Sequence, residues 1–426
     1  MIQFYNARIV PMTHDEIING EIWIDGTRIV YVGPPKETDP AAFDPETVQR
    51  IDLQGDLVLP GFKNAHTHSA MTFLRSFADD LPLHDWLTKQ VFPMEAKLTA
   101  DDVYWLSKLA IMEYLTGGIT ANFDMYMFTD AIAEAARDTG FRTVLCGTIN
   151  DFGGTPEEEA EKYVRFNRFD PHVSYILGFH AEYTCSLDLL QGLAEVAKQY
   201  KAPVFTHNAE TKSEVEGSLE RHGKTPTQLF NDLGLHDYGG GGFHCVYLQD
   251  HDVEIFKERD LHLVTNPGSN SKLASGIAPL QDYAMQGLKL SIGTDGPASN
   301  NALDFFREMY LTTVLQKLKY DDASAMPALD VLRMATVGGA HAMGLTHCDT
   351  LEVGKEADLQ VLSLKRPNFQ PENNLLKNVV YSGSKNNVRL TMVAGKILYQ
   401  DGVFDIGVEP DDVYQKANQI IHRMTN

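Results

Sequence analysis

Cysteine is scarce in this chain of 426 residues, which contains four cysteines and no pair with the CxxC spacing. Isolated cysteines of this kind fit neither a disulfide framework nor a zinc ribbon. They predict a reducing compartment, and we therefore expect the protein in the cytoplasm.

Long apolar runs are also missing. No segment reaches the roughly 18 apolar residues that a helix needs to cross a bilayer. The opening residues, MIQFYNARIVPM, have neither the basic stretch nor the continuous apolar stretch of a leader peptide. We expect no targeting segment and no membrane span.

Basic residues are in deficit: 36 Lys and Arg stand against 58 Asp and Glu, for a formal net charge of -22. Such an excess of negative charge argues against nucleic acid or an anionic membrane as a partner. The hydrophobic fraction of 43% is ordinary for a globular protein, and the chain is long enough to bury a sizeable core.

The order of apolar segments predicts a barrel. The first 56 residues resemble short strands separated by turns, and from about residue 57 apolar strands alternate with helical patterns, as in a parallel sheet covered by helices. The candidate strands are 56–66, 118–126, 142–150, 174–183, 202–210, 241–248, 261–270 and 289–300. Eight β/α units over roughly 290 residues predict an α/β fold with a (β/α)8 TIM-type barrel.

Strand-like segments return after the barrel, in ADLQVLSL, NVVYS and VRLTMVAGKILYQDG. The simplest architecture joins them to the N-terminal strands as one smaller, discontinuous β-sandwich. The predicted division is 1–56 for the first part of the sandwich, 57–350 for the barrel, 351–408 for the second part and 409–426 for a terminal helix.

The stretch PGFKNAHTHSAMTF places two histidines with one residue between them at the end of the first barrel strand. Alternate residues of a strand share a face, so His66 and His68 can bind one metal ion. This motif alone leaves open that both are half-buried polar residues.

The residues at the ends of the other predicted strands favour a metal site over half-buried polar residues. Active residues of a barrel enzyme gather at the carboxyl ends of its strands, and ionisable side chains occupy five of the eight ends here. They are His66, His68, His180, His207, Glu210, His244 and Asp295. The alternative is a coincidental set of polar strand caps.

Three imidazoles and one carboxylate suit a divalent ion such as Zn²⁺, with a further position left for water. A bound cation lowers the pKa of that water and so supplies a nucleophile near neutral pH. Glu210, three residues after His207, is placed to hand protons to a substrate nitrogen without binding the metal. Asp295 can bind the metal and also accept the proton of the water.

The same residues resemble a known family. The stretches are PGFKNAHTHSAMTFLRSFADDLPLHDWL, GFHAEYTCS, THNAETKSEVE, FHCVYL, NPGSNSKLASGIAP, GTDGPASNNALDFFREM and EVGKEADLQVLSL, in order along nearly the whole chain. They are similar to the amidohydrolase superfamily and, within it, to the 5'-methylthioadenosine/S-adenosylhomocysteine deaminases and their chlorohydrolase relatives.

The resemblance implies a role for each motif residue. His66, His68, His207 and Asp295 would hold one metal ion, zinc or alternatively iron. Glu210 would be the proton shuttle, and His244 would steady the attacking hydroxide.

The residue at the end of the fourth predicted strand implies a single metal ion. Relatives with two metals carry a carboxylated lysine there, where this chain has His180 in LGFHAEY. The resemblance places His180 against the purine and Trp86, Glu95 and Ser299 around the nucleoside, with Glu95 suited to accept hydrogen bonds from two ribose hydroxyls. The alternatives are that Trp86 only packs a helix and that Glu95 is a carboxylate at a helix N-terminus.

The chain departs from the family pattern after strand three. Members that favour S-adenosylhomocysteine carry arginines there that bind the amino-acid carboxylate, and the corresponding positions here are Gly147 and Thr155. The departure puts bidentate binding of the amino-acid carboxylate by arginine in doubt. We therefore expect adenine nucleosides with a short apolar or hydroxyl 5' group.

The expected activity is hydrolytic deamination of a purine nucleoside that releases ammonia, and the family adds the expectation of a homo-oligomer. The same site leaves open a guanine, 8-oxoguanine or pterin deaminase and an s-triazine chlorohydrolase. A binding protein on the same scaffold is the alternative from another class. Two weaker motifs are set aside: HGKTP lacks the first P-loop glycine, and the run Gly239 to Gly242 is interpreted as a loop before a strand.

Overall fold

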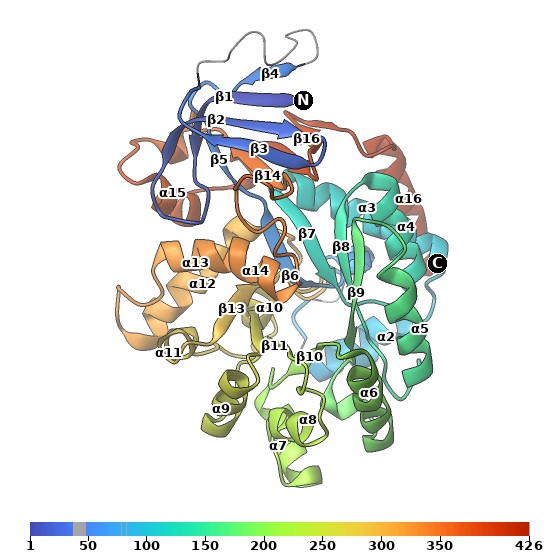
Figure 1. Cartoon of the computed structure of the whole chain (residues 1–426). Helices are drawn as coiled ribbons and strands as arrows, with labels where there is room; N and C mark the ends of the chain where they lie inside the picture. Colours follow the sequence, from blue (N-terminus) through green and yellow to red (C-terminus); the bar gives the residue numbers. More distant parts are fainter. Residues whose placement is uncertain (37–47, 78, 82, 426) are drawn as a thin grey trace.

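The chain folds around two sheets, an eight-stranded parallel one and a nine-stranded mixed one (Figure 1). The computed structural model describes residues 1–36, 48–77, 79–81 and 83–425, so residues 37–47 of the N-terminal module lie outside it. Within the described ranges, no helix is both long and apolar enough to pass through a membrane.

The parallel sheet confirms the predicted barrel. Its strands pair in sequence order, and each predicted strand segment overlaps one of them, with the first, fourth and sixth strands extending one residue outside the predicted bounds. They are β6 Phe62–Thr67, β7 Ile119–Asp124, β8 Arg142–Cys146, β9 Val173–Gly178, β10 Val204–Asn208, β11 Gly240–His244, β12 His262–Thr265 and β13 Lys289–Ile292. Most of the observed strands end before the predicted ones, and the residues left over form the loops at the carboxyl end of the barrel.

Helices cover the outside of the barrel (Figure 1). They are α3 Ala100–Thr116, α4 Thr129–Thr139, α5 Pro156–Phe166, α6 Leu187–Tyr200, α7 Lys212–His222, α8 Pro226–Asp232, α9 Asp250–Glu258, α11 Leu280–Met285, α12 Phe305–Tyr320, α13 Ala328–Arg333 and α14 Gly339–Ala342. Two short helices, α1 Leu83–Trp86 and α2 Phe92–Glu95, follow β6, and α10 Pro267–Lys272 follows β12.

The barrel is closed where the chain after β13 meets β6. The Asp295 backbone N–H donates to the His66 carbonyl at 3.0 Å, and the Thr294 N–H donates to the Asn64 side-chain oxygen at 2.9 Å. The Asn64 amide in turn donates to the Thr294 hydroxyl at 2.8 Å. These bonds bring Asp295, which follows the last strand, beside His66, from the first.

The first predicted strand, 56–66, is two strands that belong to different sheets. β5 Leu57–Pro60 pairs with strands of the mixed sheet, and β6 begins the barrel after Gly61. A Cβ at Gly61 would lie 2.1 Å from the Thr120 methyl, so only glycine allows the chain to pass between the sheets at this point. The mixed sheet therefore extends to Pro60.

The interpretation of Gly239 to Gly242 as a loop was wrong, because Gly240, Gly241 and Gly242 lie in β11. A Cβ at Gly240 would lie 1.9 Å from the Val204 carbonyl oxygen, and one at Gly241 would lie 2.1 Å from the His262 carbonyl oxygen. Close approach of the neighbouring strands, rather than turn formation, accounts for the glycines.

The mixed sheet joins both ends of the chain in the order β17-β16-β15-β14-β5-β1-β2-β3, with β4 paired to β1. Its further strands are β1 Ile2–Ile9, β2 Ile18–Asp25, β3 Arg28–Gly33, β4 Gln49–Asp52, β14 Leu359–Leu362, β15 Val388–Val393, β16 Lys396–Gln400 and β17 Val403–Phe404. Side chains from both ends of the chain, among them Phe4, Ile22 and Val361, form one buried core. This confirms a smaller β-structured part beside the barrel, but the strand predicted for NVVYS was wrong, because these residues form the end of the helix Leu375–Tyr381 and its cap.

A buried ion cluster connects the two sheets. The Asp358 carboxylate, just before β14, accepts hydrogen bonds from the Arg142 guanidinium of β8 at 2.9 and 3.1 Å and from the Lys63 ammonium of β6 at 3.3 Å. It also accepts the Ala394 N–H at 2.8 Å, while Lys63 donates to the Thr120 hydroxyl at 2.6 Å. Two cations of the barrel thus share one anion of the outer sheet.

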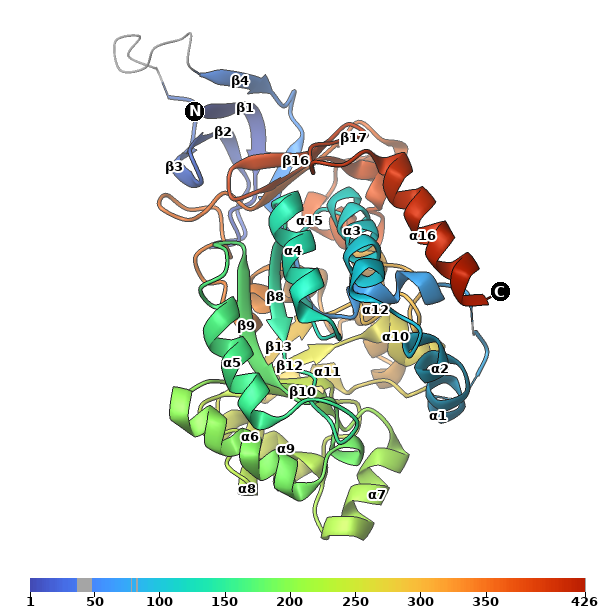
Figure 2. The ribbon, with the colours of Figure 1, turned by 90° about the vertical axis from the view of Figure 1, so that its right-hand side faces the viewer.

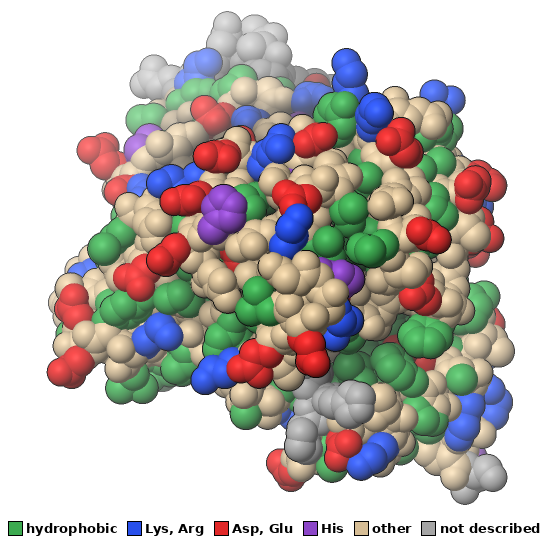
Figure 3. Space-filling model, turned by 90° about the horizontal axis from the view of Figure 1, so that it is seen from below, with side chains coloured by type: hydrophobic (Ala, Val, Ile, Leu, Met, Phe, Trp, Pro, Cys, Tyr) green, Lys and Arg blue, Asp and Glu red, His purple; other side chains and the backbone are tan. Residues whose placement is uncertain are grey.

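The C-terminal helix α16 Pro410–Thr425 packs along α3 (Figure 2), and α15 Leu375–Tyr381 packs against α12 and α13. On the face in Figure 3, acidic and basic side chains are interspersed, and no continuous basic patch is visible among the residues described there. The expectation that nucleic acid is not a partner stays a prediction.

Candidate metal centre and active-site cavity

A cavity of about 930 Å³ opens at the carboxyl end of the barrel strands. Most of the residues predicted for the site lie on its wall. They are His68, Trp86, Glu95, His180, His207, Glu210, His244, Asp295 and Ser299. Side chains that are far apart in the sequence therefore converge on one space.

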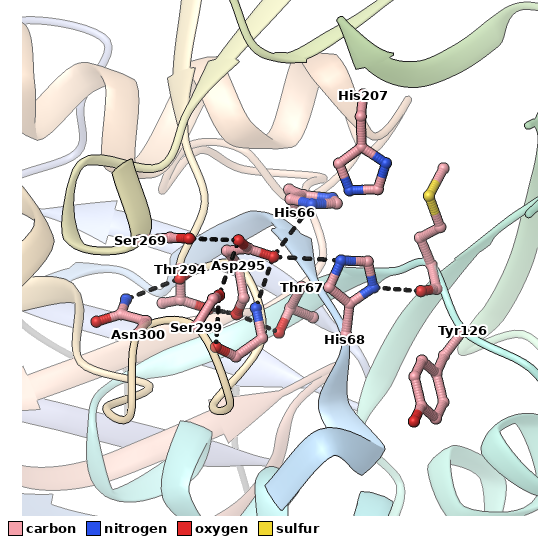
Figure 4. A network of polar contacts seen from close by, with 12 residues as sticks. His66, Thr67, His68, Tyr126, His207, Ser269, Thr294, Asp295, Ser299 and Asn300 are labelled. Carbon is pink, nitrogen blue, oxygen red and sulfur yellow. Dashed lines mark hydrogen bonds and ion pairs between the residues drawn. The ribbon is translucent and has the colours of Figure 1, made fainter. Parts of the chain in front are cut away.

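Three imidazoles lie at the base of the cavity. Donor atoms of His66, His68 and His207 lie within 4.8 Å of one another, and those of His66, His244 and Asp295 satisfy the same limit. The His66 ring is fully buried and stacks on Phe243 at 3.8 Å between ring centroids. Figure 4 shows Asp295 facing both His66 and His68, with His207 on the other side of His66.

Asp295 is held by hydroxyls on one oxygen and faces imidazoles with the other. Its Oδ2 accepts hydrogen bonds from the Ser269 hydroxyl at 2.6 Å and the Ser299 hydroxyl at 2.9 Å. Its Oδ1 lies 3.2 Å from His68 Nε2 and 3.6 Å from His66 Nε2 (Figure 4). The carboxylate is thereby turned toward the imidazole cluster.

The outer nitrogens of two imidazoles are already bonded. His68 Nδ1 lies 2.5 Å from the Met125 carbonyl oxygen, and His207 Nδ1 lies 2.7 Å from the His180 carbonyl oxygen. A carbonyl only accepts, so each Nδ1 carries the proton and each Nε2 presents a lone pair to the centre. Neither ring nitrogen of buried His66 has a hydrogen-bond partner among the described residues.

This donor set fits a divalent cation. Borderline ions such as Zn²⁺ take neutral imidazoles and a carboxylate, and a metal would satisfy one of the two unpartnered nitrogens of His66. The pKa values favour the neutral ring at two of the three histidines: burial lowers the pKa of His66 to about 3 and holds that of His207 well below its usual value, whereas Asp295 raises the pKa of His68 despite its burial. Burial would raise the pKa of Asp295, but the neighbouring His66 and His68 hold it well below the usual range.

Glu210 lies beside this cluster. Its Oε1 accepts a hydrogen bond from the Ser275 hydroxyl at 3.1 Å, and its Oε2 lies 3.8 Å from His244 Nε2. Burial raises the pKa of Glu210, although the nearby His244 opposes the shift. His244 Nδ1 bonds to the Asn270 side-chain oxygen at 2.7 Å, which directs Nε2 between Glu210 and Asp295.

Two of these residues have strained backbones. His244 has a φ of 68° and Asp295 a φ of 58°, in the left-handed region that side-chain-bearing residues rarely adopt. Both stand where a strand turns into its loop. Strain of this kind concentrates at functional sites, where the surrounding structure enforces it.

The outer cavity contains the remaining predicted residues. Trp86 ends α1, is 5% exposed and belongs to a hydrophobic cluster, so it packs the fold and lines the cavity at once. Glu95, the last residue of α2, accepts a hydrogen bond from the Tyr126 hydroxyl at 2.6 Å. His180 Nδ1 lies 3.0 Å from the Thr184 hydroxyl, and burial lowers the pKa of His180 to about 4.

Sequence reasoning missed the residues that support the predicted ones. Ser269 and Asn270 bond to Asp295 and His244, and both follow strand β12, one of the three strands whose ends had no assigned function. The rule that found the histidines, polar residues at strand ends, would have found this pair as well. The same rule would have found Tyr126, at the end of the second predicted strand, whereas Ser275 carries no such signal.

Comparison with known proteins shows the relationship. The model of the amidohydrolase family matches residues 57–398. The chain belongs to the amidohydrolase family. Amidohydrolase membership agrees with the barrel, the outer sheet and the strand-end cluster described above.

Individual amidohydrolase relatives cover the whole chain. It is 37% identical to 5-methylthioadenosine/S-adenosylhomocysteine deaminase of Thermoanaerobacter pseudethanolicus, across 98% of this chain and 99% of that one. It is 38% identical to 5'-deoxyadenosine deaminase of Methanosarcina mazei, across 99% and 98%. A crystal structure of an adenosine deaminase from Xanthomonas campestris with bound zinc superposes with a TM-score of 0.92 at 31% identity, covering 100% of this chain and 98% of that one.

Proposed function

We propose that this amidohydrolase is a metal-dependent hydrolytic deaminase of adenine nucleosides, converting 5'-methylthioadenosine, 5'-deoxyadenosine or adenosine into ammonia and the inosine analogue. The observation that carries the proposal is one cavity that combines a four-donor metal set with the buried acid Glu210. The relatives named as deaminases of such nucleosides supply the substrate class.

The cation of the proposal is Zn²⁺, with iron as the alternative, held by His66, His68, His207 and Asp295. When bound there, a divalent cation acidifies a water molecule and so supplies the nucleophile near neutral pH. The zinc-bound structural relative supports the choice of metal.

The residues around the centre divide the proton transfers. Glu210 gives its proton to the ring nitrogen next to the amino-bearing carbon. As the water oxygen bonds to that carbon, Asp295 takes a proton from the water and delivers it to the amino nitrogen, so that the C–N bond breaks and ammonia leaves. Glu210 recovers a proton from the new hydroxyl, and the Nε2 edge of His244 steadies the oxygen as charge develops on it.

The nucleoside is proposed to lie in the outer cavity. His180 contacts the purine, and Trp86 and Ser299 lie around the nucleoside. Glu95 accepts hydrogen bonds from the ribose hydroxyls, since Tyr126 occupies only one of its oxygens. Burial raises the pKa of Glu95, which makes hydrogen bonds from the sugar favourable to its charged form.

The 5' group is proposed to be uncharged. A side chain at Gly147 would collide with the backbone of Gly178 at 2.5 Å, and the Thr155 hydroxyl caps α5 by accepting the Glu158 N–H. Lys162 is on the cavity wall, but its ammonium pairs with buried Glu159 at 3.1 Å. A free amino-acid carboxylate would find no unpaired cation among the described residues there, which makes S-adenosylhomocysteine the poorer substrate.

The setting of the protein is part of the proposal. All four cysteines are free thiols, which suits a reducing cytoplasm. Assembly into a homo-oligomer is retained as a proposal from the family, and size-exclusion chromatography with light scattering tests it.

A substrate panel tests the function. Purified enzyme with measured metal content is offered 5'-methylthioadenosine, 5'-deoxyadenosine, adenosine, S-adenosylhomocysteine, guanine, 8-oxoguanine, a pterin and a chlorotriazine, and release of ammonia or chloride is recorded. The proposal requires the first three to give the highest kcat/KM. A preference for guanine, the pterin or the triazine would refute it.

A further inference from the structure

The turn that presents Glu210 to the cavity is three residues long. β10 ends at Asn208 and α7 begins at Lys212, with Thr211 as its cap. Ala209, in between, has a φ of 51°, so the chain reverses in a conformation that alanine rarely adopts. Something other than local preference must hold this turn.

Glu214 binds the turn from the first turn of α7. Its Oε1 accepts the Ala209 backbone N–H at 2.9 Å, and its Oε2 accepts the Glu210 backbone N–H at 2.8 Å. Both oxygens of one carboxylate are thus used on two consecutive amides. Two charge-assisted bonds fix the direction in which Glu210 leaves the backbone.

The arrangement differs from ordinary helix capping. In a capping box, the acid at the third helical position bonds back to the N–H of the capping residue itself. Here Thr211 does accept the Glu214 N–H at 3.2 Å, but the Glu214 carboxylate extends past Thr211 to the two residues before it. The start of α7 needs only the hydrogen bond from the Glu214 N–H to Thr211, and not the two bonds that the Glu214 carboxylate accepts.

Glu214 also lies in an unfavourable place for a charge. It is 5% exposed, and within the described parts of the chain no Lys, Arg or His lies within ion-pair distance of it. Burial, together with the charge of Glu210, raises the pKa of Glu214 to about 7 despite the two amide donors. A buried acid without a cation costs stability, so packing alone does not explain it.

We propose that Glu214 is the positioning residue of the proton shuttle: its carboxylate grips the Ala209 and Glu210 amides and thereby aims the Glu210 side chain into the cavity. The role of Glu210 in turnover rests on the proposed function, whereas the aiming itself is a statement about geometry. Glu214 lies behind the turn and is absent from the described cavity wall, so it acts only through Glu210.

A double-mutant cycle tests the proposal on the full-length, metal-loaded enzyme. Glu214→Gln keeps the shape of the side chain but presents an N–H donor to one of the two backbone amides in place of an acceptor. The Glu210 side chain is then no longer held in its direction into the cavity. We expect kcat with the best nucleoside to fall roughly 10- to 100-fold, as for other supporting residues. KM and metal content should stay within about threefold of the parent, because the metal and substrate contacts are untouched.

The cycle is completed in the Glu210→Gln background. If Glu214 acts only through Glu210, adding E214Q there changes kcat by less than about threefold. Equal loss in both backgrounds would overturn the proposal, because it would mean a general structural role. Glu216→Gln, an exposed acid on the same helix, is the matched control and should retain parent activity.

A measurement without turnover separates this inference from the proposed function. In a crystal structure of E214Q, the Glu210 carboxylate should have left its position beside Ser275; a Glu210 still in place would overturn the inference whatever the substrate is. If E214Q is insoluble, Glu214→Asp goes through the same tests, since the shorter side chain reaches at most one of the two amides. Failure of the unmodified enzyme on every adenine nucleoside would instead refute the proposed function.

Discussion

Replacement of Asp358 by asparagine should strongly destabilise the protein, because Asp358 is the shared anion of the buried cluster between the two sheets. The substitution keeps the size of the side chain and removes its charge. Lys63 and Asp358 have side chains with no exposure, and that of Arg142 is 3% exposed. Water therefore cannot replace the lost carboxylate.

The expected loss of unfolding free energy follows from the partners that each of the two cations keeps after the substitution. Arg142 keeps a second partner, Glu356, at 2.7 Å, whereas Lys63 keeps, among the described residues, only the neutral Thr120 hydroxyl. One buried ammonium is thus left without a counter-charge, and the newly introduced amide group would point a donor at another donor. Removal of one partner from a buried ion pair costs about 3–5 kcal/mol of unfolding free energy.

Urea denaturation followed by tryptophan fluorescence and circular dichroism measures this loss. The exposed pair of Lys224 and Asp232 provides the control: Asp232→Asn should shift the midpoint far less, because water replaces the partner. Adding Lys63→Met to Asp358→Asn should restore part of the loss, because the uncompensated charge is gone. A shift for Asp358→Asn as small as that of the control would refute the reasoning.

The effect has a defined pH dependence. Burial opposes ionisation of Asp358, but Arg142 and Lys63 hold its pKa in the folded protein far below the ordinary value of about 4. A group with a lowered folded pKa stabilises fully above its unfolded pKa, and this stability is lost as the pH falls below it. The stability difference between parent and Asp358→Asn should therefore be constant near neutrality and shrink below about pH 4.

Three further predictions concern the site. Glu210→Gln should retain its metal, as measured by elemental analysis, but its kcat should fall roughly 10²- to 10⁴-fold, because the amide keeps the bond to Ser275 and has no acidic proton to give. Ammonia release at the parent rate would disprove the role of Glu210. Dialysis against a chelator should abolish turnover and lower the melting temperature, and added Zn²⁺ should restore both, since a ligand of the folded state stabilises it; a chelated protein that still deaminates would exclude the metal. Ser269→Ala removes a 2.6 Å bond to Asp295 and should weaken metal retention in competition with a coloured chelator by roughly 10- to 100-fold; unchanged retention would show that Ser299 suffices.

The barrel and the central residues were predictable because their signals are periodic. Parallel strands buried on both faces appear as apolar runs, and their carboxyl ends lie together in any barrel. Placing His66, His207 and Asp295 at such ends was therefore enough to predict that they meet. No distance information was needed, only the topology.

The remaining features depend on contacts that the sequence does not encode locally. The apolar run 57–66 gives no sign that it changes sheets at Gly61, because the clash with Thr120 comes from another strand. The glycines of β11 look like a loop because the strands that crowd them, β10 and β12, lie elsewhere in the sequence. Glu214 stands three residues after Thr211, where the T-x-x-E pattern indicates only a helix cap.

The left-handed backbone at His244 and Asp295 sets a limit on engineering this enzyme. Substitution by glycine at either turn would relax the main chain, because glycine adopts positive φ without steric conflict, and would remove a side chain of the proposed mechanism in the same step. A directed-evolution campaign that selected for heat resistance alone would favour such replacements. Thermal screens of this scaffold should therefore record ammonia production for every clone that they retain.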